Sequence, residues 1–480
     1  MQSDARLFGV FNLRVPASFS LFFAAGFLLH FGVLYPGFMC YDSVNQILEA
    51  REGLYSDWHP PLMAIMWRHI EQIIPGQAGM LFLQLGWVWI GAGLIFQAFF
   101  KPCCGWLGAL LLGLLFFLPP VFGISGAILK DVLMWGALLT AFGFAGQIKS
   151  GFGLCRWNII LLGLTVLALW LAILLRHNAV FATIPLLGFA LFRLYHRYDF
   201  IGLTRAVLPA VLIVGVLFSV SGSINQRLAD RHTQPWVANA TFDIVGILKR
   251  MPDQSAQQAL FAVLAGIFHA DGSMEPLLKS YTPMYWREVF RSKPPVLRLP
   301  EYSIGVQIRG FESFSAEQLD ALRRLWTGSI MAEPLLWLRH RLAVSEYVLG
   351  WIPDSSWSPV MMEKESPLDL QPAYGVFPTA TPLQRTLERL MTDWSNDWFF
   401  QPWPYLIVLS MVFLWVCFRP IASNIEIIGL SASGLLHELG LMLAAPSPDY
   451  RYSHYMVFCT LLSLLLLARP WMAQRSRVEY

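Results

Sequence analysis

The sequence predicts an all-α polytopic membrane protein with about ten transmembrane helices and a mainly helical domain outside the membrane. Of its 480 residues, 56% are apolar and only 14% are charged, and the mean hydropathy is +0.52. An average soluble domain carries about 25% charged residues. Long apolar runs recur at both ends of the chain, whereas residues 223–402 contain none. A soluble protein is excluded, and the net charge of +3 gives no indication of a nucleic-acid partner.

The transmembrane helices are predicted from apolar runs, because a membrane-spanning helix needs roughly 20 apolar residues. We expect spans at 17–36, 79–100, 105–122, 132–148, 157–175, 179–195, 206–222, 403–419, 421–444 and 455–469. The third of these runs ends in two prolines, Pro119 and Pro120.

Lys and Arg in the short loops predict the orientation, since they are enriched in cytoplasmic loops. With both termini in the cytoplasm, the inner loops and tails carry Arg6, Arg14, Lys101, Lys149, Arg156, Arg193, Arg197, Arg205, Arg419, Arg469, Arg475 and Arg477. The short outer loops carry fewer, namely Arg51, Arg68, Lys130, Arg176 and Arg451. This bias predicts that both termini are cytoplasmic.

Three parts of the chain follow from these spans. Residues 1–222 form an N-terminal transmembrane module with a long first outer loop (37–78), residues 223–402 form an extracytoplasmic domain, and residues 403–480 form the C-terminal transmembrane helices. Two helix starts are expected in the outer domain. Ser315 and Gln318 form one capping-box pattern, and Thr381 and Gln384 form another, with Pro at the first helical position.

The first outer loop contains the first candidate site residues. Asp42 follows the first apolar run closely, where a carboxylate can accept a proton from the hydroxyl group of a substrate. It also fits a plain alternative, the start of a short amphipathic helix. His59 precedes Pro60 and Pro61, which restrict the backbone, although two prolines before a helix are also an ordinary helix start.

Lys130 and Asp131 begin the fourth apolar run. Asp131 either favours the positive end of that helix or faces the same cavity as Asp42 as a second acidic group. The residues alone leave both interpretations open.

Two arginines at outer helix ends, Arg176 and Arg451, are candidates for binding a lipid phosphate or pyrophosphate. The guanidinium group binds phosphate in a fork geometry that Lys cannot match, although contact with lipid headgroups is an alternative role. Glu438 lies within the ninth apolar run, and an intramembrane carboxylate is a functional-site hypothesis by default.

The six cysteines have no spacing typical of a metal site or a disulfide framework. We therefore expect unpaired thiols, no metal centre and no cofactor.

The order of these elements resembles the GT-C superfamily of membrane glycosyltransferases. The elements are Tyr41-Asp42-Ser43 and Trp58-His59-Pro60-Pro61 in the first outer loop, Lys130-Asp131 at the fourth span, and a large outer domain late in the chain. The chain looks like members related to protein mannosyltransferases, lipid A aminoarabinose transferases and O-antigen-modifying glucosyltransferases. The motifs cover roughly residues 17–200, and beyond these only the architecture is similar.

The resemblance implies a GT-C-like fold in a bacterial inner membrane. It implies a polyprenyl-phosphate sugar as donor, a cell-envelope glycan or lipid as acceptor, and reaction at the outer face with inversion. Asp42 would be the general base and Asp131 the second acidic residue of the active site. Tyr41, His59 and Lys130 would contact substrate. Some relatives carry Glu directly after the first-loop Asp, where this chain has Ser43.

Three other classes of function compete with this interpretation. The first is an O-antigen ligase or polymerase that acts on pyrophosphate-linked glycans, and the second is a flippase or transporter for a lipid-linked sugar. The third is a structural or scaffold protein whose outer domain binds a partner, which would leave the ionisable groups of the outer face unexplained. Transporters are often built from inverted repeats with sites near the membrane midplane. This chain has no evident repeat, and its ionisable groups gather at one face.

Overall fold

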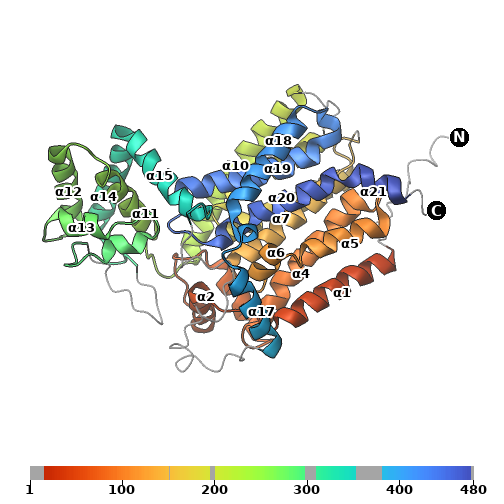
Figure 1. The fold of residues 1–480 in the computed structure, drawn as a ribbon, viewed down its shortest axis with the longest axis horizontal. Coiled ribbons are helices and arrows are strands. Elements are labelled where there is room, and N and C mark those ends of the chain that lie inside the picture. The colour runs from red at the N-terminus through yellow and green to blue at the C-terminus, as the bar shows by residue number, and fades with distance from the viewer. Residues whose placement is uncertain (1–15, 151, 195–199, 298–309, 353–380, 477–480) are drawn as a thin grey trace.

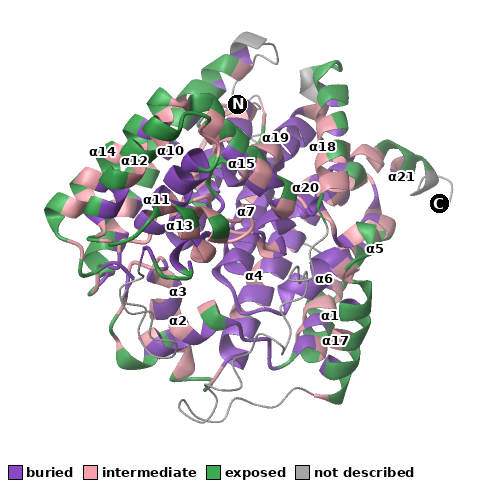
Figure 2. Ribbon diagram, turned by 60° about the vertical axis from the view of Figure 1, so that its left-hand side comes forward, coloured by how far each residue is buried: buried purple, intermediate pink, exposed green. Residues whose placement is uncertain are grey.

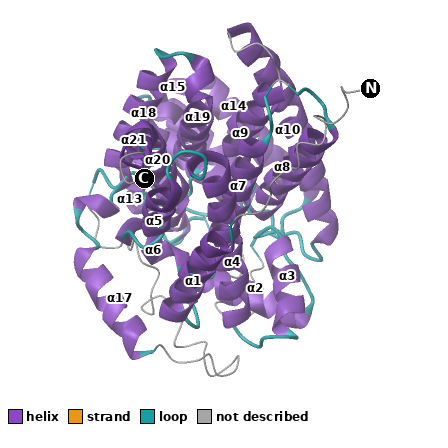
Figure 3. Ribbon diagram, turned by 90° about the vertical axis from the view of Figure 1, so that its right-hand side faces the viewer, coloured by secondary structure: helices purple, strands orange, loops and turns teal. Residues whose placement is uncertain are grey.

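The computed structural model describes residues 16–150, 152–194, 200–297, 310–352 and 381–476. These residues form helices and loops, with two isolated β-bridges and no strand among them (Figure 3). The all-α prediction is confirmed for this part of the chain.

A bundle of long helices forms the larger part of the molecule (Figure 1). Its members are α1 (Ala17–Leu34), α4 (Ala78–Ile95) with the π-helix η1 (Phe96–Phe100), α5 (Gly105–Leu115), α6 (Pro119–Ser125), α7 (Lys130–Gln147), α8 (Arg156–Leu175), α9 (Ala179–Leu194), α10 (Phe200–Leu228), α18 (Pro402–Cys417), α19 (Ile421–Ala444), α20 (Tyr450–Leu467) and α21 (Arg469–Ser476).

Six helices of the described chain are long and apolar enough to cross a membrane. They are Ala17–Leu34, Ala78–Phe100, Arg156–Leu175, Gly202–Leu228, Asn424–Ala444 and Tyr450–Gln474. The pair α5 and α6 would add a seventh span, and it bends by 62° where Pro119 and Pro120 interrupt the helix. The polytopic membrane protein is therefore supported, but the number of ten spans is not confirmed. Helices α9 and α18 are apolar but shorter.

Helix α7 lies inside the bundle, and almost all of its residues are buried (Figure 2). Glycines allow it to approach α4 closely. A Cβ atom added to Gly91 would lie 2.7 Å from the Cβ of Leu139, and one added to Gly143 would lie 2.5 Å from the Cβ of Leu94. This packing holds α7 close against α4.

The first outer loop folds into α2 (Tyr41–Glu52) and α3 (Leu62–Glu71). A parallel bridge joins Phe38 to Ala127, just before α7. The hydroxyl of Ser43 donates a hydrogen bond of 2.6 Å to the carbonyl of Ile128. These contacts set α2 against the start of α7, and they bring the segment with Asp42 next to Lys130.

A smaller group of helices, named the outer group for its place beside the bundle, projects from one side of it (Figure 1). It comprises α11 (Trp236–Leu248), α12 (Gln254–Ile267), α13 (Met274–Ser280), the 3₁₀ helix η2 (Trp286–Phe290), α14 (Ala316–Ala332) and α15 (Pro334–Val348). These helices have an apolar core of their own, which Leu441, Ala445 and Tyr452 of the bundle also join. Ser315 forms the predicted capping box with Gln318 at the start of α14.

Hydrogen bonds tie this outer group to the segment between α19 and α20. Arg341 donates to the carbonyl of Ala445 at 3.0 Å, and the backbone amide of Trp286 donates to the carbonyl of Pro446 at 3.2 Å. Within the outer group, Arg341 also forms a buried ion pair of 2.7 Å with Asp243.

Helix α17 (Pro382–Trp394) begins with the second predicted capping box, formed by Thr381 and Gln384, and is followed by the 3₁₀ helix η5 (Trp398–Phe400). The side chain of Gln384 donates a hydrogen bond of 2.8 Å to the carbonyl of Leu34 at the end of α1. The division of the chain into 1–222, 223–402 and 403–480 stays a proposal.

Candidate active site

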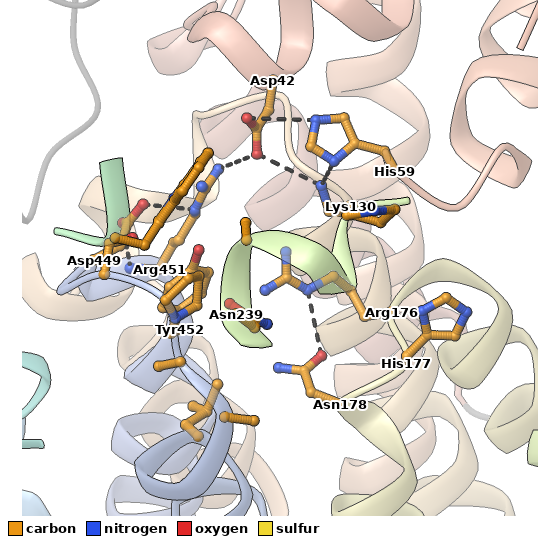
Figure 4. Close-up of a pocket in the computed structure, with 18 of the residues that line it drawn as sticks. Asp42, His59, Lys130, Arg176, His177, Asn178, Asn239, Asp449, Arg451 and Tyr452 are labelled. Carbon is orange, nitrogen blue, oxygen red and sulfur yellow. Dashed lines mark hydrogen bonds and ion pairs between the residues drawn. The ribbon is translucent and has the colours of Figure 1, made fainter. Parts of the chain in front are cut away.

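One cavity of about 870 Å³ brings together most of the predicted site residues (Figure 4). Its walls come from α2, the loop before α3, the start of α7, the turn between α8 and α9, α11, η2, and the segment between α19 and α20. Six predicted residues line it: Tyr41, Asp42, His59, Lys130, Arg176 and Arg451. Asp131 and Glu438 do not.

Asp42 lies in the first turn of α2, so the helix that was the plain alternative is present. Its carboxylate nevertheless faces the cavity and is surrounded by nitrogen atoms (Figure 4). Oδ2 accepts a hydrogen bond of 2.6 Å from Arg451 and lies 3.5 Å from the Nζ of Lys130. Oδ1 lies 3.5 Å from the Nε2 of His59.

The tautomer of His59 follows from the contact of its Nδ1 atom with Lys130. Nδ1 is 2.7 Å from the Nζ of Lys130, and an ammonium group can only donate. Nδ1 is therefore the acceptor, and the ring proton of neutral His59 resides on Nε2. That Nε2 is buried and lies 3.5 Å from Oδ1 of Asp42, so the imidazole N–H and the carboxylate are direct neighbours.

The surroundings fix the charge states of both groups at neutral pH. Burial raises the pKa of Asp42, but Arg451, His59 and Lys130 outweigh this effect, and the pKa is held well below its usual range. Burial, together with the charge of Lys130, lowers the pKa of His59 to about 4. Asp42 is thus a carboxylate and His59 a neutral imidazole.

Two guanidinium groups lie near the ring of Tyr452. The Cζ atoms of Arg176 and Arg451 lie 5.1 Å and 5.2 Å from the centre of that ring, within the range of a cation–π contact. Asp449 precedes α20, and its carboxylate forms an ion pair of 2.7 Å with the Nε of Arg451. These contacts hold two strong phosphate-binding groups at one wall of the cavity.

Asp131 lies behind this wall. It is 1% exposed, and its carboxylate is 3.2 Å from the guanidinium of Arg176. Asp131 makes no capping hydrogen bond, because Leu129 is the N-cap of α7 and no side chain caps that helix. Its place suits a residue that orients Arg176 rather than one that contacts substrate.

Glu438 is fully buried on α19, where it accepts a hydrogen bond of 2.8 Å from the hydroxyl of Ser453 on α20. The structure does not bring it to the cavity, and it joins two helices instead.

One part of the cavity wall is apolar. Val180 and Phe181 of α9, Phe218 of α10, and Leu441 and Ala444 of α19 form it. Phe181 is 38% exposed and Phe218 is 41% exposed, so the cavity reaches the outer surface of the helical bundle here. In a membrane this opening would face lipid.

Sequence reasoning did not assign a role to several lining residues. Asp449 and Tyr452 flank Arg451, and their nearness to a candidate arginine was the available signal. Asn239, Tyr285 and Trp286 come from the outer helices. No sequence pattern connects those three residues to the first outer loop.

Among the described residues, no group of three or more His, Cys, Asp or Glu side chains is arranged to hold a metal ion.

Comparison with known proteins found no matching family model and no matching curated protein. Among solved structures, the chain is similar to ArnT from Cupriavidus metallidurans bound to undecaprenyl phosphate, with a TM-score of 0.34 and 12% identity over 95% of this chain and 79% of that chain. A likeness this weak carries no argument about activity.

Proposed function

We propose that this chain is a membrane glycosyltransferase of the GT-C type. It moves a sugar from a polyprenyl-phosphate donor to a hydroxyl of a cell-envelope glycan or lipid, with inversion, at the outer face of a bacterial inner membrane. Both termini lie in the cytoplasm in this proposal. The observation that carries it is the environment of Asp42, a carboxylate that lines the cavity between phosphate-binding cations on one side and the neutral imidazole of His59 on the other.

The apolar opening and the arginines together suit a lipid phosphate. A polyprenyl chain would lie along Phe181 and Phe218, with its phosphate between Arg176 and Arg451. Cationic groups aimed at the phosphate stabilise the negative charge that develops as it leaves.

The acceptor hydroxyl would approach the carboxylate of Asp42, which lines the cavity and keeps part of its surface exposed. The hydroxyl would donate its proton to Asp42. The neutral imidazole of His59, 3.5 Å from Oδ1, would hold that carboxylate in place. This leaves the lone pair of the hydroxyl free for attack on the sugar.

Donor binding would also make Asp42 a better base. Arg451 and Lys130, which hold the pKa of Asp42 down, are groups that a phosphate would engage. A phosphate between Arg451 and Lys130 would weaken their electrostatic attraction to Asp42. The pKa of the Asp42 carboxyl would then rise, which improves proton abstraction. The base would therefore become active mainly when the donor is in place.

The bond changes balance in one displacement. The acceptor oxygen bonds to the anomeric carbon from the face opposite the phosphate, and the bond between that carbon and the phosphate oxygen breaks. The polyprenyl phosphate leaves with the electron pair, and the hydroxyl proton passes to Asp42. Attack from the opposite face gives inversion.

The proposal is tested with a panel of radiolabelled polyprenyl-phosphate sugars, presented to membranes that contain wild type or Asp42→Asn. We expect label transfer to envelope glycans or lipids with at least one donor. Removal of a general base should lower it by about 10²-fold or more. Asp320→Asn on α14, a carboxylate that is 61% exposed, is the matched control. Lipid–sugar binding with no transfer from any donor would instead favour the ligase or transporter.

A further inference from the structure

One wall of the cavity is not used by the transfer step above. Tyr285, Trp286 and Arg287 of the outer group face the cavity together with Trp58 of the first outer loop. The rings of Trp58 and Trp286 are 6.1 Å apart and inclined by 48°. The guanidinium of Arg287 lies 5.7 Å from the Trp286 ring. The first outer loop and the outer helices thus build one aromatic surface.

This aromatic surface adjoins the proposed base. Trp58 is the neighbour of His59, and the Nε2 of His59 is 3.5 Å from Asp42. Hydrogen bonds hold the short segment that carries both side chains. The carboxylate of Asp57 accepts two of them from Thr233. The backbone amide of Thr233 donates one at 2.5 Å, and the hydroxyl of Thr233 donates the other at 2.6 Å. A molecule that rests on Trp58 therefore has its reactive end beside Asp42.

The wall is amphipathic in the way a sugar ring requires. Indole rings have an apolar face with negative charge, which attracts the positively polarised C–H groups of a pyranose face. The hydroxyls at the edge of a sugar need hydrogen-bonding groups. Asn239 reaches the cavity from α11 (Figure 4), and no hydrogen bond of its side-chain amide occurs in the described parts of the chain. Arg287 supplies further donors.

A lipid acceptor fits this wall less well. The apolar surface that would bind an acyl or prenyl chain lies at α9 and α10, along Phe181 and Phe218, and the donor's tail would occupy it. The wall of Trp58 and Trp286 offers aromatic faces together with polar groups, which is the lining expected for a polar ring.

We propose that the acceptor is a carbohydrate, and that Trp58 and Trp286 bind the pyranose ring whose hydroxyl reacts. This proposal rests on the proposed transfer function and names its acceptor class. Asn239 and Arg287 contact the hydroxyls of that ring. The outer group is then part of the acceptor site, because Trp286, Asn239 and Arg287 all belong to it.

The test uses the full chain in lipid nanodiscs, with a labelled donor and three acceptor probes. The probes are a panel of methyl glycosides and short oligosaccharides, a Ser/Thr-containing peptide, and diacylglycerol. Transfer to each probe and to water is measured for wild type, Trp58→Leu, Trp58→Phe and Trp286→Phe. Trp236→Leu is the control, since Trp236 lies in the outer group and stacks on Trp326.

We expect wild type to transfer to at least one saccharide. In Trp58→Leu the KM for that saccharide should rise about tenfold, a larger change than in kcat, whereas in Trp236→Leu the KM, kcat and donor hydrolysis by water should stay near wild type. Trp58→Phe should restore part of the affinity. Trp286 is only 7% exposed, so a small residue in its place would disturb the fold. Phe is therefore used, and thermal unfolding checks that Trp286→Phe is folded.

Two results would overturn the inference. One is transfer to the peptide or diacylglycerol alone, and the other is an unchanged saccharide KM in Trp58→Leu and Trp286→Phe. An absence of any donor turnover by wild type, even to water, would instead contradict the proposed function. Saccharide binding, measured separately by saturation-transfer NMR and lost in Trp58→Leu but not in Trp236→Leu, would in that case still support the sugar site.

Discussion

At the residue scale, a polar side chain beside an apolar run was the most useful signal in the sequence. Charge near hydrocarbon is costly, and this pointed to Asp42, Lys130, Arg176 and Arg451 before the structure placed all four around one cavity. The same reasoning also selected Glu438, which joins two helices away from the cavity. The rule finds residues that need a partner, and it does not tell a structural partner from a substrate.

Arg451→Gln should weaken donor binding more than it slows the chemical step. It removes a guanidinium that we assign to the donor phosphate, and a hydrogen bond to a charged group contributes about 1.5–3 kcal/mol. The donor KM should rise about 10- to 100-fold. Transfer kinetics at varied donor concentration measure this, and an unchanged donor KM would count against the assignment.

The pH dependence of stability should reveal the buried imidazole of His59. Its pKa is 6.5 in an unfolded chain and about 4 in the fold, so the unfolded state binds more protons between these values. Stability from His59 is complete above pH 6.5 and is lost as the pH falls toward 4. Thermal unfolding of wild type at pH 7.5 and pH 5 should show the loss, and His59→Gln should reduce it. An equal loss in both proteins would contradict this account.

At the scale of elements, local sequence chemistry predicted helix starts well and membrane spans less well. The capping boxes at Ser315 and Thr381 are formed, because both partners lie within one turn. The number of membrane spans was harder to predict from the sequence. Helix α7 has the length of a span, but it carries Lys130 and Asp131 and is enclosed by other helices, so tertiary packing rather than hydropathy decides its environment.

Ser43→Ala should destabilise the attachment of α2 to the start of α7. Ser43 is fully buried, and its hydroxyl donates to the carbonyl of Ile128. Loss of that bond leaves a buried acceptor unpaired, at a cost of about 1–3 kcal/mol. Thermal unfolding should show a lower Tm. Transfer should fall as well, because α2 places Asp42 beside Lys130. Ser395→Ala, whose hydroxyl hydrogen bond at the end of α17 is exposed, should have little effect.

At the scale of the whole molecule, the outer helices and the bundle form the cavity together. This joint construction could not be predicted, because Asn239 and Trp286 are separated from Asp42 by long stretches of sequence. Only the fold sets them opposite one another. The sequence predicts a region outside the membrane over residues 223–402, and in the structure helices of this region bind the carbonyls of Ala445 and Pro446, just before Asp449 and Arg451.

Arg341→Leu should loosen that segment and lower transfer without touching the cavity. Arg341 pairs with buried Asp243 and donates to the carbonyl of Ala445. Removal of one partner from a buried pair costs about 3–5 kcal/mol. Hydrogen exchange over residues 445–449 should accelerate. Arg324→Leu on α14, 74% exposed, should leave the exchange unchanged, and equal exchange in all three proteins would argue against this link.

The most direct test of the central claim measures donor affinity and turnover on the same preparation of Asp42→Asn. If the donor phosphate replaces Asp42 as the ion-pair partner of Arg451 and Lys130, Asp42→Asn should bind polyprenyl phosphate at least as tightly as wild type. Its transfer rate should still fall by about 10²-fold or more. Near-normal transfer, or an equal loss of affinity and rate, would contradict the account.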